Sequence, residues 1–496
     1  MKKFDIAVIG SGAGLLVTEA ALGAGMTCAI VERSKFGGTC LNRGCIPSKI
    51  LVYPADIIRE AQHAKRVGVD VPVVNADWDR ISERMWRQIK YSEQIETRLT
   101  ETETLTVFRG TGEFTGPKTM SVTDYDGNTE EFEADRFVIA AGAHSFVPPI
   151  EGLEEAGYVI SETFFGGKFP QKPWKSLIII GGGPIGAEFA HIFSAMGTKV
   201  TILQGGERIL NTEEEEISLF VRHQFEQNGI DVFTNAQVLS AGSKDGRKTV
   251  SFKDKTTNEL LSVSGEEILV SAGVRSNGTA LKLERANVET DAKGWIITNE
   301  YLETSRKNIW AIGDINGKYQ FRHKANYEAE ILTHNLLKSP DNRKRACYNA
   351  VPWAIFTHPQ VAHVGITERE AKAAGIACHV AKNHYSDVIG GIKMGYSKRY
   401  DDDGFVKMIV GDDKKILGVH IVGPDAAILL QPFVYLMNAG LICPGQIRKS
   451  SVRTEIDELR VMCPPLGTYA PILNSMVIHP SLSELTAWAF ENIDWN

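Results

Sequence analysis

Two cysteines have a spacing at which they could form a working redox pair. Cys40 and Cys45 lie five positions apart in the glycine-rich segment FGGTCLNRGCIPSK, residues 36–49. A zinc site would need two more ligands at suitable spacing, and the nearest candidate, His63, stands alone in a polar stretch. The spacing also excludes a CxxC redox helix. We therefore expect thiol chemistry here and no metal site.

The overall cysteine content argues against a purely structural disulfide between Cys40 and Cys45. Seven cysteines in 496 residues are too few for a disulfide framework, and a lasting bridge is unusual in a reducing compartment. A disulfide that opens and closes during a reaction is the stronger interpretation of Cys40 and Cys45.

The segment before the cysteines is typical of a dinucleotide-binding βαβ unit. An apolar strand at 4–9 leads into a glycine turn, a helix-like stretch at 15–25, and a second strand that ends at Glu32. In such a unit the helix N-terminus faces a pyrophosphate, and the acid accepts ribose hydroxyls. Leu15 stands where the third glycine of the motif belongs, so this copy alone is a weak signal. The glycines of the turn are Gly10, Gly12 and Gly14.

A second copy of the unit, residues 174–204, carries the full glycine spacing, and two copies imply two nucleotide cofactors. Its glycines are Gly181, Gly183 and Gly186. The following strand ends at Gln204, where an acid would accept the 2′-hydroxyl of NAD and arginines would bind the 2′-phosphate of NADP. Only Arg208 follows within a few residues. The missing acid weakens NAD, and the missing arginine pair weakens NADP more.

Three further segments complete the organisation of the chain. Residues 137–149 form a strand, a turn containing Gly142 and a diproline stop, as where a chain passes between nucleotide domains. The strand at 308–315 presents Asp314, either to sugar hydroxyls or as a helix N-cap. From about residue 350, strand pairs followed by helices indicate an α+β unit suited to a subunit interface. The predicted fold class is α/β, with two Rossmann-like dinucleotide-binding domains and a C-terminal α+β dimerisation domain.

Charge and hydropathy exclude two classes of partner. A net charge of −7 provides no basic field for nucleic acid. The uncharged stretch 426–447 contains Gln431, Pro432 and Asn438 and has no positive-inside bias, so we expect a buried interface helix and no membrane. The apolar run at the N-terminus breaks into glycines without a cleavage site, and we expect a cytoplasmic protein.

The order of the motifs is that of an electron relay. A CxxxxC loop follows one nucleotide unit and precedes another, which suits transfer among nicotinamide, flavin, disulfide and substrate thiol. Together with IWAIGD, HKANYEAE, ILGVHIVG and HPSLSE, these motifs resemble the pyridine nucleotide-disulfide oxidoreductases over nearly the whole chain, and within them the dihydrolipoyl dehydrogenases most.

The resemblance implies a role for each matching residue. Cys45 would lie beside the flavin, Cys40 would exchange with substrate, and Lys49 would pair with Glu188. The FAD-lining positions would be Gly10, Gly12, Gly14, Glu32, Lys49, Gly112, Gly142, Asp314, Arg322 and His323. The NAD(P) positions would be Gly181, Gly183, Gly186, Glu188, Gln204, Val238 and Gly273. The expected domains are 1–150 and 276–349 for FAD, 151–275 for NAD(P), and 350–496 for dimerisation.

Exchange needs a base, because the thiolate and not the thiol attacks a disulfide. His479 in IHPSLSE is the best candidate, and Glu484 can return across the turn to hold the imidazole. In the family this histidine reaches the active site of the partner subunit, so the resemblance implies a homodimer with two shared sites.

The resemblance predicts a dihydrolipoyl dehydrogenase that passes electrons from a small dithiol or a lipoyl-carrying protein through Cys40–Cys45 and FAD to NAD⁺. The alternative within the family is an NAD(P)H-dependent reductase of a low-molecular-weight disulfide, similar to mycothione reductase. An alternative of another class is a flavin-bearing redox sensor or complex subunit with little turnover. The segment between Gly440 and His479 is longer than usual in the family, and the sequence leaves open a surface excursion or a pocket with Cys443 or Cys463 as an extra thiol.

Overall fold

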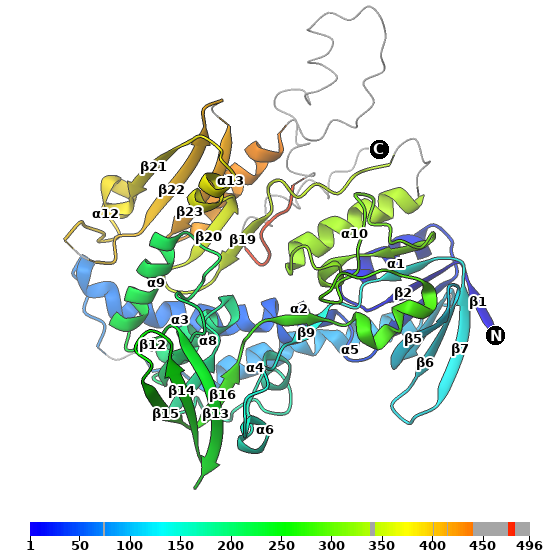
Figure 1. Ribbon diagram of the computed structural model, residues 1–496, viewed down its shortest axis with the longest axis horizontal. Coiled ribbons are helices and arrows are strands. Elements are labelled where there is room, and N and C mark those ends of the chain that lie inside the picture. The colour runs from blue at the N-terminus through cyan, green and yellow to red at the C-terminus, as the bar shows by residue number, and fades with distance from the viewer. Residues whose placement is uncertain (73–74, 338–342, 400, 414, 440–474, 482–496) are drawn as a thin grey trace, which may run out of the picture.

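The computed structural model describes the chain except for residues 73–74, 338–342, 400, 414, 440–474 and 482–496. Three units, each built on its own main sheet, lie around a central region where the cysteine-bearing helices run (Figure 1). The first two units have parallel main sheets and the third an antiparallel one, which confirms the predicted fold class.

The first unit is a doubly wound nucleotide fold. Its five strands are all parallel in the order β4-β3-β2-β8-β18, the 3-2-1-4-5 order of Rossmann-like sheets. Alternate residues of β2 enter two different buried clusters, so both faces of the sheet are covered and the strands read as continuous apolar runs. The strands are β2 (Ile6–Ile9), β3 (Cys28–Glu32), β4 (Leu105–Arg109), β8 (Phe137–Ile139) and β18 (Ile309–Ala311). The packed helices α1 (Gly14–Gly23) and α10 (Arg322–Leu337) cover one face.

A smaller sheet flanks this unit and accounts for a difference from the sequence-based expectation. The predicted strand at 4–9 is divided at Asp5, whose carboxylate accepts hydrogen bonds from the Thr27 amide (2.7 Å) and hydroxyl (2.8 Å). Residues before Asp5 therefore pair with the smaller sheet. Its strands are β1 (Lys2–Phe4), β7 (Thr129–Ala134), β6 (Thr119–Thr123) and β5 (Thr111–Gly116).

The second unit repeats the parallel plan in the order β12-β11-β10-β16. These strands are β10 (Ser176–Ile180), β11 (Lys199–Leu203), β12 (Asp231–Phe233) and β16 (Glu267–Val270), with α8 (Pro184–Ala195) and α9 (Glu215–Gln227). An antiparallel sheet of β13 (Ala236–Lys244), β14 (Arg247–Asp254) and β15 (Leu260–Gly265) packs beside them. The two-stranded sheet of β9 (Ala143–Ser145) and β17 (Val274–Ser276) joins the first two units.

The third unit is an antiparallel sheet in the order β19-β20-β23-β22-β21, with α13 packed against it. Its strands are β19 (Pro352–Ile355), β20 (Val361–Gly365), β21 (Cys378–His384), β22 (Phe405–Gly411) and β23 (Ile416–Val422). Its helices are α11 (Glu368–Ala373), α12 (Ile389–Ile392) and α13 (Ala426–Asn438). Within the described ranges, no helix combines the length and apolar character needed to cross a membrane.

The remaining elements connect these units. They are α2 (Gly38–Arg43), α3 (Cys45–His63), α4 (Trp78–Ile89), α5 (Tyr91–Thr100), α6 (Leu153–Ala156), α7 (Ser161–Phe164), and the 3₁₀ turns η1 (Ala64–Val67), η2 (Gly278–Leu281), η3 (Leu283–Ala286), η4 (Gly313–Asn316) and η6 (Tyr385–Asp387). The long helix α3 packs against α2, α4 and α8, so it links the first unit to the second.

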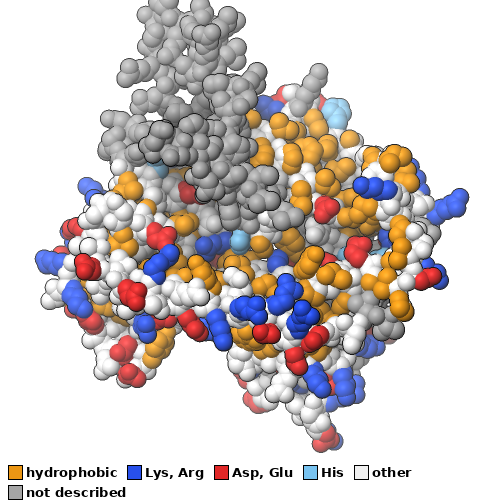
Figure 2. Space-filling view, turned by 180° about the vertical axis from the view of Figure 1, so that it is seen from behind, with side chains coloured by type: hydrophobic (Ala, Val, Ile, Leu, Met, Phe, Trp, Pro, Cys, Tyr) orange, Lys and Arg blue, Asp and Glu red, His pale blue; other side chains and the backbone are white. Residues whose placement is uncertain are grey.

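Hydrophobic side chains gather on the surface of the third unit, at the upper right of Figure 2. Its exposed large apolar residues include Ile389 (77% exposed), Ile392 (51%), Leu429 (47%) and Leu436 (59%). Exposed apolar groups that gather on one face are typical of a surface that another chain covers.

Candidate active site

The two cysteines of the opening motif form a disulfide at the junction of two helices. Cys40 lies in α2 and Cys45 is the first residue of α3, with Gly44 between the helices and a Cα–Cα distance of 4.8 Å. Cys40 is buried and Cys45 is half-buried. The two sulfur atoms therefore have different surroundings, as a disulfide that passes electrons from one side to the other requires.

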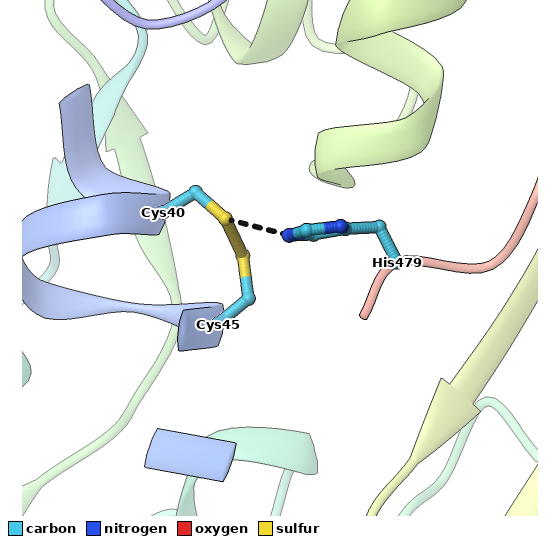
Figure 3. Close-up of side chains that lie close together, drawn as sticks. All are labelled: Cys40, Cys45 and His479. Atoms are coloured by element: carbon cyan, nitrogen blue, oxygen red, sulfur yellow. Dashed lines mark hydrogen bonds between the residues drawn. A yellow bond between two sulfur atoms is a disulfide. The ribbon is translucent and has the colours of Figure 1, made fainter. Parts of the chain in front are cut away.

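His479 lies beside this disulfide (Figure 3). Its Nε2 atom is 3.3 Å from the Cys40 sulfur, which puts the imidazole within reach of Cys40, and the ring lies alongside the disulfide with the Cys45 sulfur also within 4.8 Å. The cysteine in this contact belongs to the same chain, whereas the resemblance implies the partner's. Residues 440–474, which connect α13 to this histidine, and Glu484, its expected acid, lie outside the described residues.

His323 contacts the backbone of the segment that carries His479. Its Nε2–H donates to the Pro352 carbonyl at 2.7 Å, so in the neutral ring Nδ1 is an acceptor, and the backbone N–H of His479 lies 3.5 Å from it. Burial lowers the pKa of His323 to about 4, which keeps the ring neutral near pH 7. The resemblance predicts this residue as a flavin contact, and the contact that the structure shows is with the backbone of His479.

On the other side of the motif, Lys49 and Glu188 form an ion pair between α3 and α8. The Lys49 ammonium lies 2.7 Å and 2.9 Å from the two carboxylate oxygens of Glu188. The Phe356 N–H donates to the same carboxylate at 3.0 Å, and the Lys49 nitrogen is 4.9 Å from the Phe356 ring centroid. The pairing implied by the resemblance is therefore present, and it joins all three units.

A cavity of about 580 Å³ runs along the disulfide. It brings together most of the residues predicted for catalysis and flavin binding: Gly10, Gly12, Glu32, Cys40, Cys45, Lys49, Gly112, Gly142, Asp314, Arg322, His323 and His479. Glu188, which the resemblance assigns to NAD(P), lines the same cavity. Residues far apart in the sequence thus form one continuous site that extends from a nucleotide-binding turn to a redox disulfide and a histidine.

Two family models match the chain. The model described as pyridine nucleotide-disulphide oxidoreductase matches residues 4–329, and that of the dimerisation domain of these enzymes matches residues 351–450. The chain belongs to the pyridine nucleotide-disulphide oxidoreductase family.

Individual relatives show how the chain lies within this family. Mycothione reductase of Mycobacterium tuberculosis is 33% identical over 459 residues, which cover 90% of this chain and 95% of the relative. Dihydrolipoyl dehydrogenase of Chlamydia pneumoniae is 29% identical over 445 residues, covering 89% and 92%. The solved Cu(II) complex of the HOCl-induced flavoprotein disulfide reductase RclA from Escherichia coli is similar over 100% of both chains, with a TM-score of 0.75 and 25% identity.

The family binds FAD and a pyridine nucleotide, and the cavity fits a flavin dinucleotide. A Cβ added at Gly12 would meet no atom within 4 Å, so the backbone there is open to a ligand at the start of α1. Gly14 takes over the packing role of the missing glycine at Leu15, because a Cβ at Gly14 would lie 2.7 Å from a Val8 methyl group. Glu32, at the end of β3, accepts hydrogen bonds from the Ser11 amide (2.9 Å) and hydroxyl (2.6 Å), which hold it at the cavity.

A buried pair that the sequence analysis did not single out supports Asp314. Lys324 and Glu328 are fully buried, lie 2.9 Å apart, and are separated by one turn of α10. The Lys324 ammonium donates to the Gly313 carbonyl at 3.0 Å, and Glu328 accepts from the Gly313 N–H at 2.7 Å. Burial raises the pKa of Asp314 to about 6. The signal in the sequence was the i,i+4 Lys–Glu spacing within HKANYEAE.

The predicted nucleotide positions of the second unit lie outside this cavity, apart from Glu188. Gly181 follows β10, Gln204 follows β11 and Gly273 follows β16, so they share the carboxyl edge of a parallel sheet, where such sheets bind ligands. Gly186 permits the close approach of α8, since a Cβ there would lie 2.1 Å from the Gly181 carbonyl oxygen. Gly183 precedes α8, and Val238 lies in β13.

Proposed function

We propose that the chain is a dihydrolipoyl dehydrogenase that works through Cys40, Cys45 and His479. The observation that carries this proposal is the 3.3 Å contact between His479 Nε2 and the Cys40 sulfur within the cavity. A base at this position can take the proton of an incoming thiol beside the sulfur that the thiol attacks.

The proposed exchange uses only Cys40, Cys45, His479 and the substrate, and in the proposed shared sites the histidine and the cysteine pair come from different copies of the chain. His479 accepts a proton from one thiol of the dithiol, and the resulting thiolate attacks the Cys40 sulfur. The Cys40–Cys45 bond breaks, Cys45 leaves as a thiolate, and a mixed disulfide forms at Cys40. The second substrate thiol gives its proton to solvent and attacks the substrate sulfur of that mixed disulfide. This step releases the cyclic disulfide and Cys40, whose sulfur takes the proton that His479 holds. Two electrons then reside on the cysteine pair, and FAD, when bound, supplies the carrier between this pair and the nicotinamide.

The part of the cavity wall that the third unit contributes supports an uncharged dithiol as the substrate, while the charged residues Arg43, Lys49 and Glu188 line the cavity from elsewhere in the chain. The described residues beyond position 350 that line the cavity are Ala354, Phe356 and His479, none of which carries a fixed charge. The lipoyl ring and chain are largely apolar, and apolar walls favour them over a charged disulfide.

We propose NAD as the preferred nucleotide. The side chain of Gln204 accepts a hydrogen bond from the Gly182 N–H at 2.8 Å, so it is held at the glycine turn. Arg208 is largely buried and pairs with Glu215 at 3.1 Å. An arginine that already has a carboxylate partner is poorly placed to bind a 2′-phosphate.

The test is reduction of NAD⁺ and, separately, of NADP⁺ by dihydrolipoamide, with the purified flavoprotein as catalyst. We expect rapid turnover with NAD⁺ and its loss in Cys45→Ser. The matched control is Cys347→Ser, because Cys347 is a half-buried free cysteine that does not line the cavity. Absence of turnover by the wild-type protein would refute the proposal.

The second candidate is a reductase of a low-molecular-weight disulfide, which the 33% identity to a mycothione reductase favours. This function requires NADH or NADPH to reduce the flavin and the cysteine pair while lipoamide is ignored. A protein whose cysteines are reduced but which turns over neither substrate would instead fit the redox sensor. The dihydrolipoyl dehydrogenase proposal also includes a homodimer with shared sites, a lipoyl-carrying protein as partner and a cytoplasmic location.

A further inference from the structure

We propose that Glu213, His363 and His420 form a binding site for a divalent transition-metal ion, with Zn²⁺ as the probe. The site lies between the second and third units, and none of its three residues lines the catalytic cavity, so it goes beyond the proposed redox function. Glu213 precedes α9, His363 lies in β20, and His420 lies in β23.

The three side chains converge in the interior. His363 and His420 are directly opposed in the antiparallel pair of β20 and β23, so both point to the same face of the sheet. One oxygen of Glu213 and one ring nitrogen of each histidine lie within 4.8 Å of one another. The residues are 1%, 2% and 0% exposed in chain order, so a ligand there would be shielded from water.

His420 has the hydrogen bonding of a metal ligand. Its Nε2–H donates to the Ile366 carbonyl at 3.0 Å, which leaves the lone pair on Nδ1. That Nδ1 atom is buried and finds no hydrogen-bond partner in the part of the chain that the structure describes. Metal-binding histidines usually donate their other ring N–H to a carbonyl or carboxylate in this way, and a metal ion would use the otherwise unpaired nitrogen.

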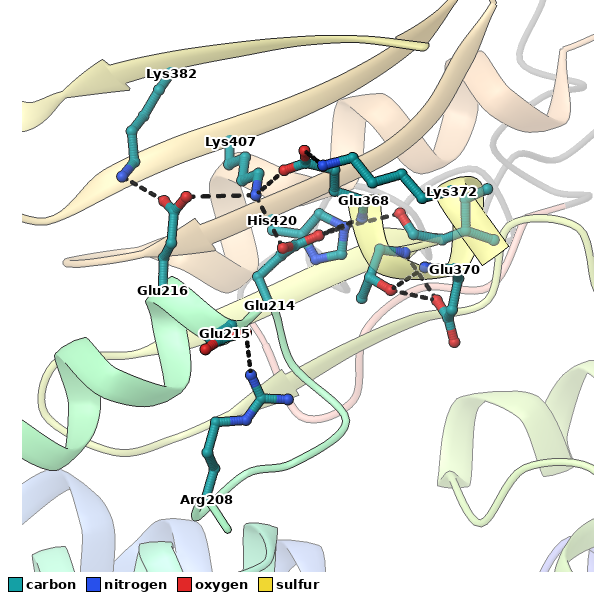
Figure 4. A network of polar contacts seen from close by, with 12 residues as sticks. Arg208, Glu214, Glu215, Glu216, Glu368, Glu370, Lys372, Lys382, Lys407 and His420 are labelled. Atoms are coloured by element: carbon teal, nitrogen blue, oxygen red, sulfur yellow. Dashed lines mark hydrogen bonds and ion pairs between the residues drawn. The ribbon is translucent and has the colours of Figure 1, made fainter. Parts of the chain in front are cut away.

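Glu213 brings a negative charge that neighbouring lysines do not neutralise. The adjacent acids Glu214, Glu216 and Glu368 share the Lys407 ammonium at 2.9, 3.6 and 2.7 Å (Figure 4). Glu213 instead contacts His363 Nδ1 at 2.6 Å and accepts from the Trp353 N–H at 2.7 Å. No lysine or arginine among the described residues lies within ion-pair distance of Glu213, so a bound cation would supply the missing positive charge.

The ligand types select the class of ion. Two imidazoles and a carboxylate are an established donor set for Zn²⁺, which leaves a fourth position for water. Ca²⁺ and Mg²⁺ prefer oxygen ligands alone, and Cu⁺ prefers sulfur. A borderline divalent ion therefore fits this site better than a hard or a soft one.

The test uses the full-length flavoprotein with Cys40→Ser and Cys45→Ser, because the active-site thiols and His479 could themselves bind metal once reduced. Equilibrium dialysis against Zn²⁺, followed by metal analysis, should give one ion per chain. X-ray absorption at the zinc edge should show nitrogen and oxygen neighbours at about 2.0–2.2 Å and no sulfur at about 2.3 Å. Neither readout requires turnover, so failure of the proposed dithiol activity would leave this test intact.

In the same background, His420→Gln and Glu213→Gln should each weaken zinc binding at least about 100-fold. The matched control is His379→Gln, which removes an exposed histidine that pairs with Asp412 at 3.0 Å and should bind zinc as the parent does. Absence of stoichiometric zinc in the parent, or sulfur neighbours in its absorption spectrum, would overturn the proposal without any ligand variant having to fold. Unchanged binding in a folded His420→Gln protein would overturn it as well.

Discussion

We expect the imidazole of His479 to affect thiol–disulfide exchange and not the reduction of the flavin by NADH. In His479→Gln the side chain keeps a polar tip but cannot take up the thiol proton. Reduction of the Cys40–Cys45 pair by a dithiol should therefore slow about 10²–10⁴-fold, while reduction of the flavin by NADH should keep its wild-type rate. Stopped-flow spectroscopy of the two half-reactions measures both, and His379→Gln is the control. An equal loss in both half-reactions would show that the histidine acts on structure and not on proton transfer.

The nucleotide preference depends on Gln204 and its neighbours. Gln204→Glu supplies the acid that accepts ribose hydroxyls, so the ratio of kcat/KM for NAD to that for NADP should rise about 10-fold or more, the worth of one charged hydrogen bond. Steady-state kinetics with both nucleotides give the ratio. A variant whose kcat/KM for NADP rises more than that for NAD would contradict the proposed arrangement. The control for added charge is Gln227→Glu, at an exposed residue of the second unit that does not line the cavity.

Single residues could be predicted from the sequence where the spacing itself carries the chemistry. The CxxxxC motif and the glycine turns are local patterns, so Cys40, Cys45 and the nucleotide positions could be proposed directly. Glu213 and His363 are 150 positions apart, and their meeting with His420 depends on how β20 and β23 pair. Spacing along the chain contains no sign of that register.

Strand β22 contacts the second unit through the buried ammonium group of Lys407. Lys407 is 3% exposed and pairs with Glu214, which is 5% exposed, and with Glu368 (Figure 4). Lys407→Met leaves these carboxylates without their cation and should destabilise the fold by roughly 3–5 kcal/mol. Lys382→Met removes a more exposed partner of Glu216 and should cost less than about 1 kcal/mol. Denaturant midpoints compare the two, and equal effects would contradict the role of burial.

Helices α3 and α8 meet at a pair that should make stability depend on pH. Asp56 Oδ1 lies 2.8 Å from His191 Nε2, and burial raises the pKa of Asp56 from 3.8 to about 7. Between pH 4 and 7 the unfolded chain loses this proton while the folded chain keeps it, so the contribution of this group to stability falls as pH rises.

Asp56→Asn keeps a donor to His191 and removes this titration. Relative to wild type, the variant should therefore gain stability from pH 4 to pH 7, by at most about 4 kcal/mol. Thermal melting of both proteins across that range measures the difference. The control is Asp412→Asn, which changes an exposed pair and should show no such trend. If the melting temperatures of Asp56→Asn and wild type changed with pH in parallel, the raised pKa of Asp56 would be disproved.

Element boundaries show where sequence patterns end and tertiary contacts begin. The alternation of apolar runs and glycines predicted both βαβ units. The division of the strand at 4–9 depends on Asp5 binding Thr27 from the next strand, which no local pattern contains. Helix α13 begins at the start of the uncharged stretch, as expected. Gln431 can be buried within it because its amide donates to the Met476 carbonyl at 3.1 Å and its oxygen accepts from the Ile478 N–H at 3.2 Å. A polar residue inside an apolar helix thus holds the segment that carries His479.

The whole molecule raises the question of which subunit supplies that histidine. The match to the dimerisation domain supports a homodimer, and the third unit exposes Ile389 and Leu436 on its surface. Within one chain, residues 475–481 lie between the first unit and the third (Figure 1). Residues 440–474, which join α13 to this segment, lie outside the described residues.

Mixed dimers distinguish the two arrangements. In a dimer of one Cys45→Ser chain and one His479→Gln chain, shared sites pair the intact cysteines of the second chain with the intact histidine of the first, so one site remains whole. If each chain served its own site, both sites would lack an essential group. We expect the heterodimer, isolated with two different affinity tags, to recover dithiol-dependent NAD⁺ reduction that neither parent homodimer has. An inactive heterodimer with bound flavin would assign the histidine to its own chain, and the contact between His479 and Cys40 would then be the catalytic one as it stands.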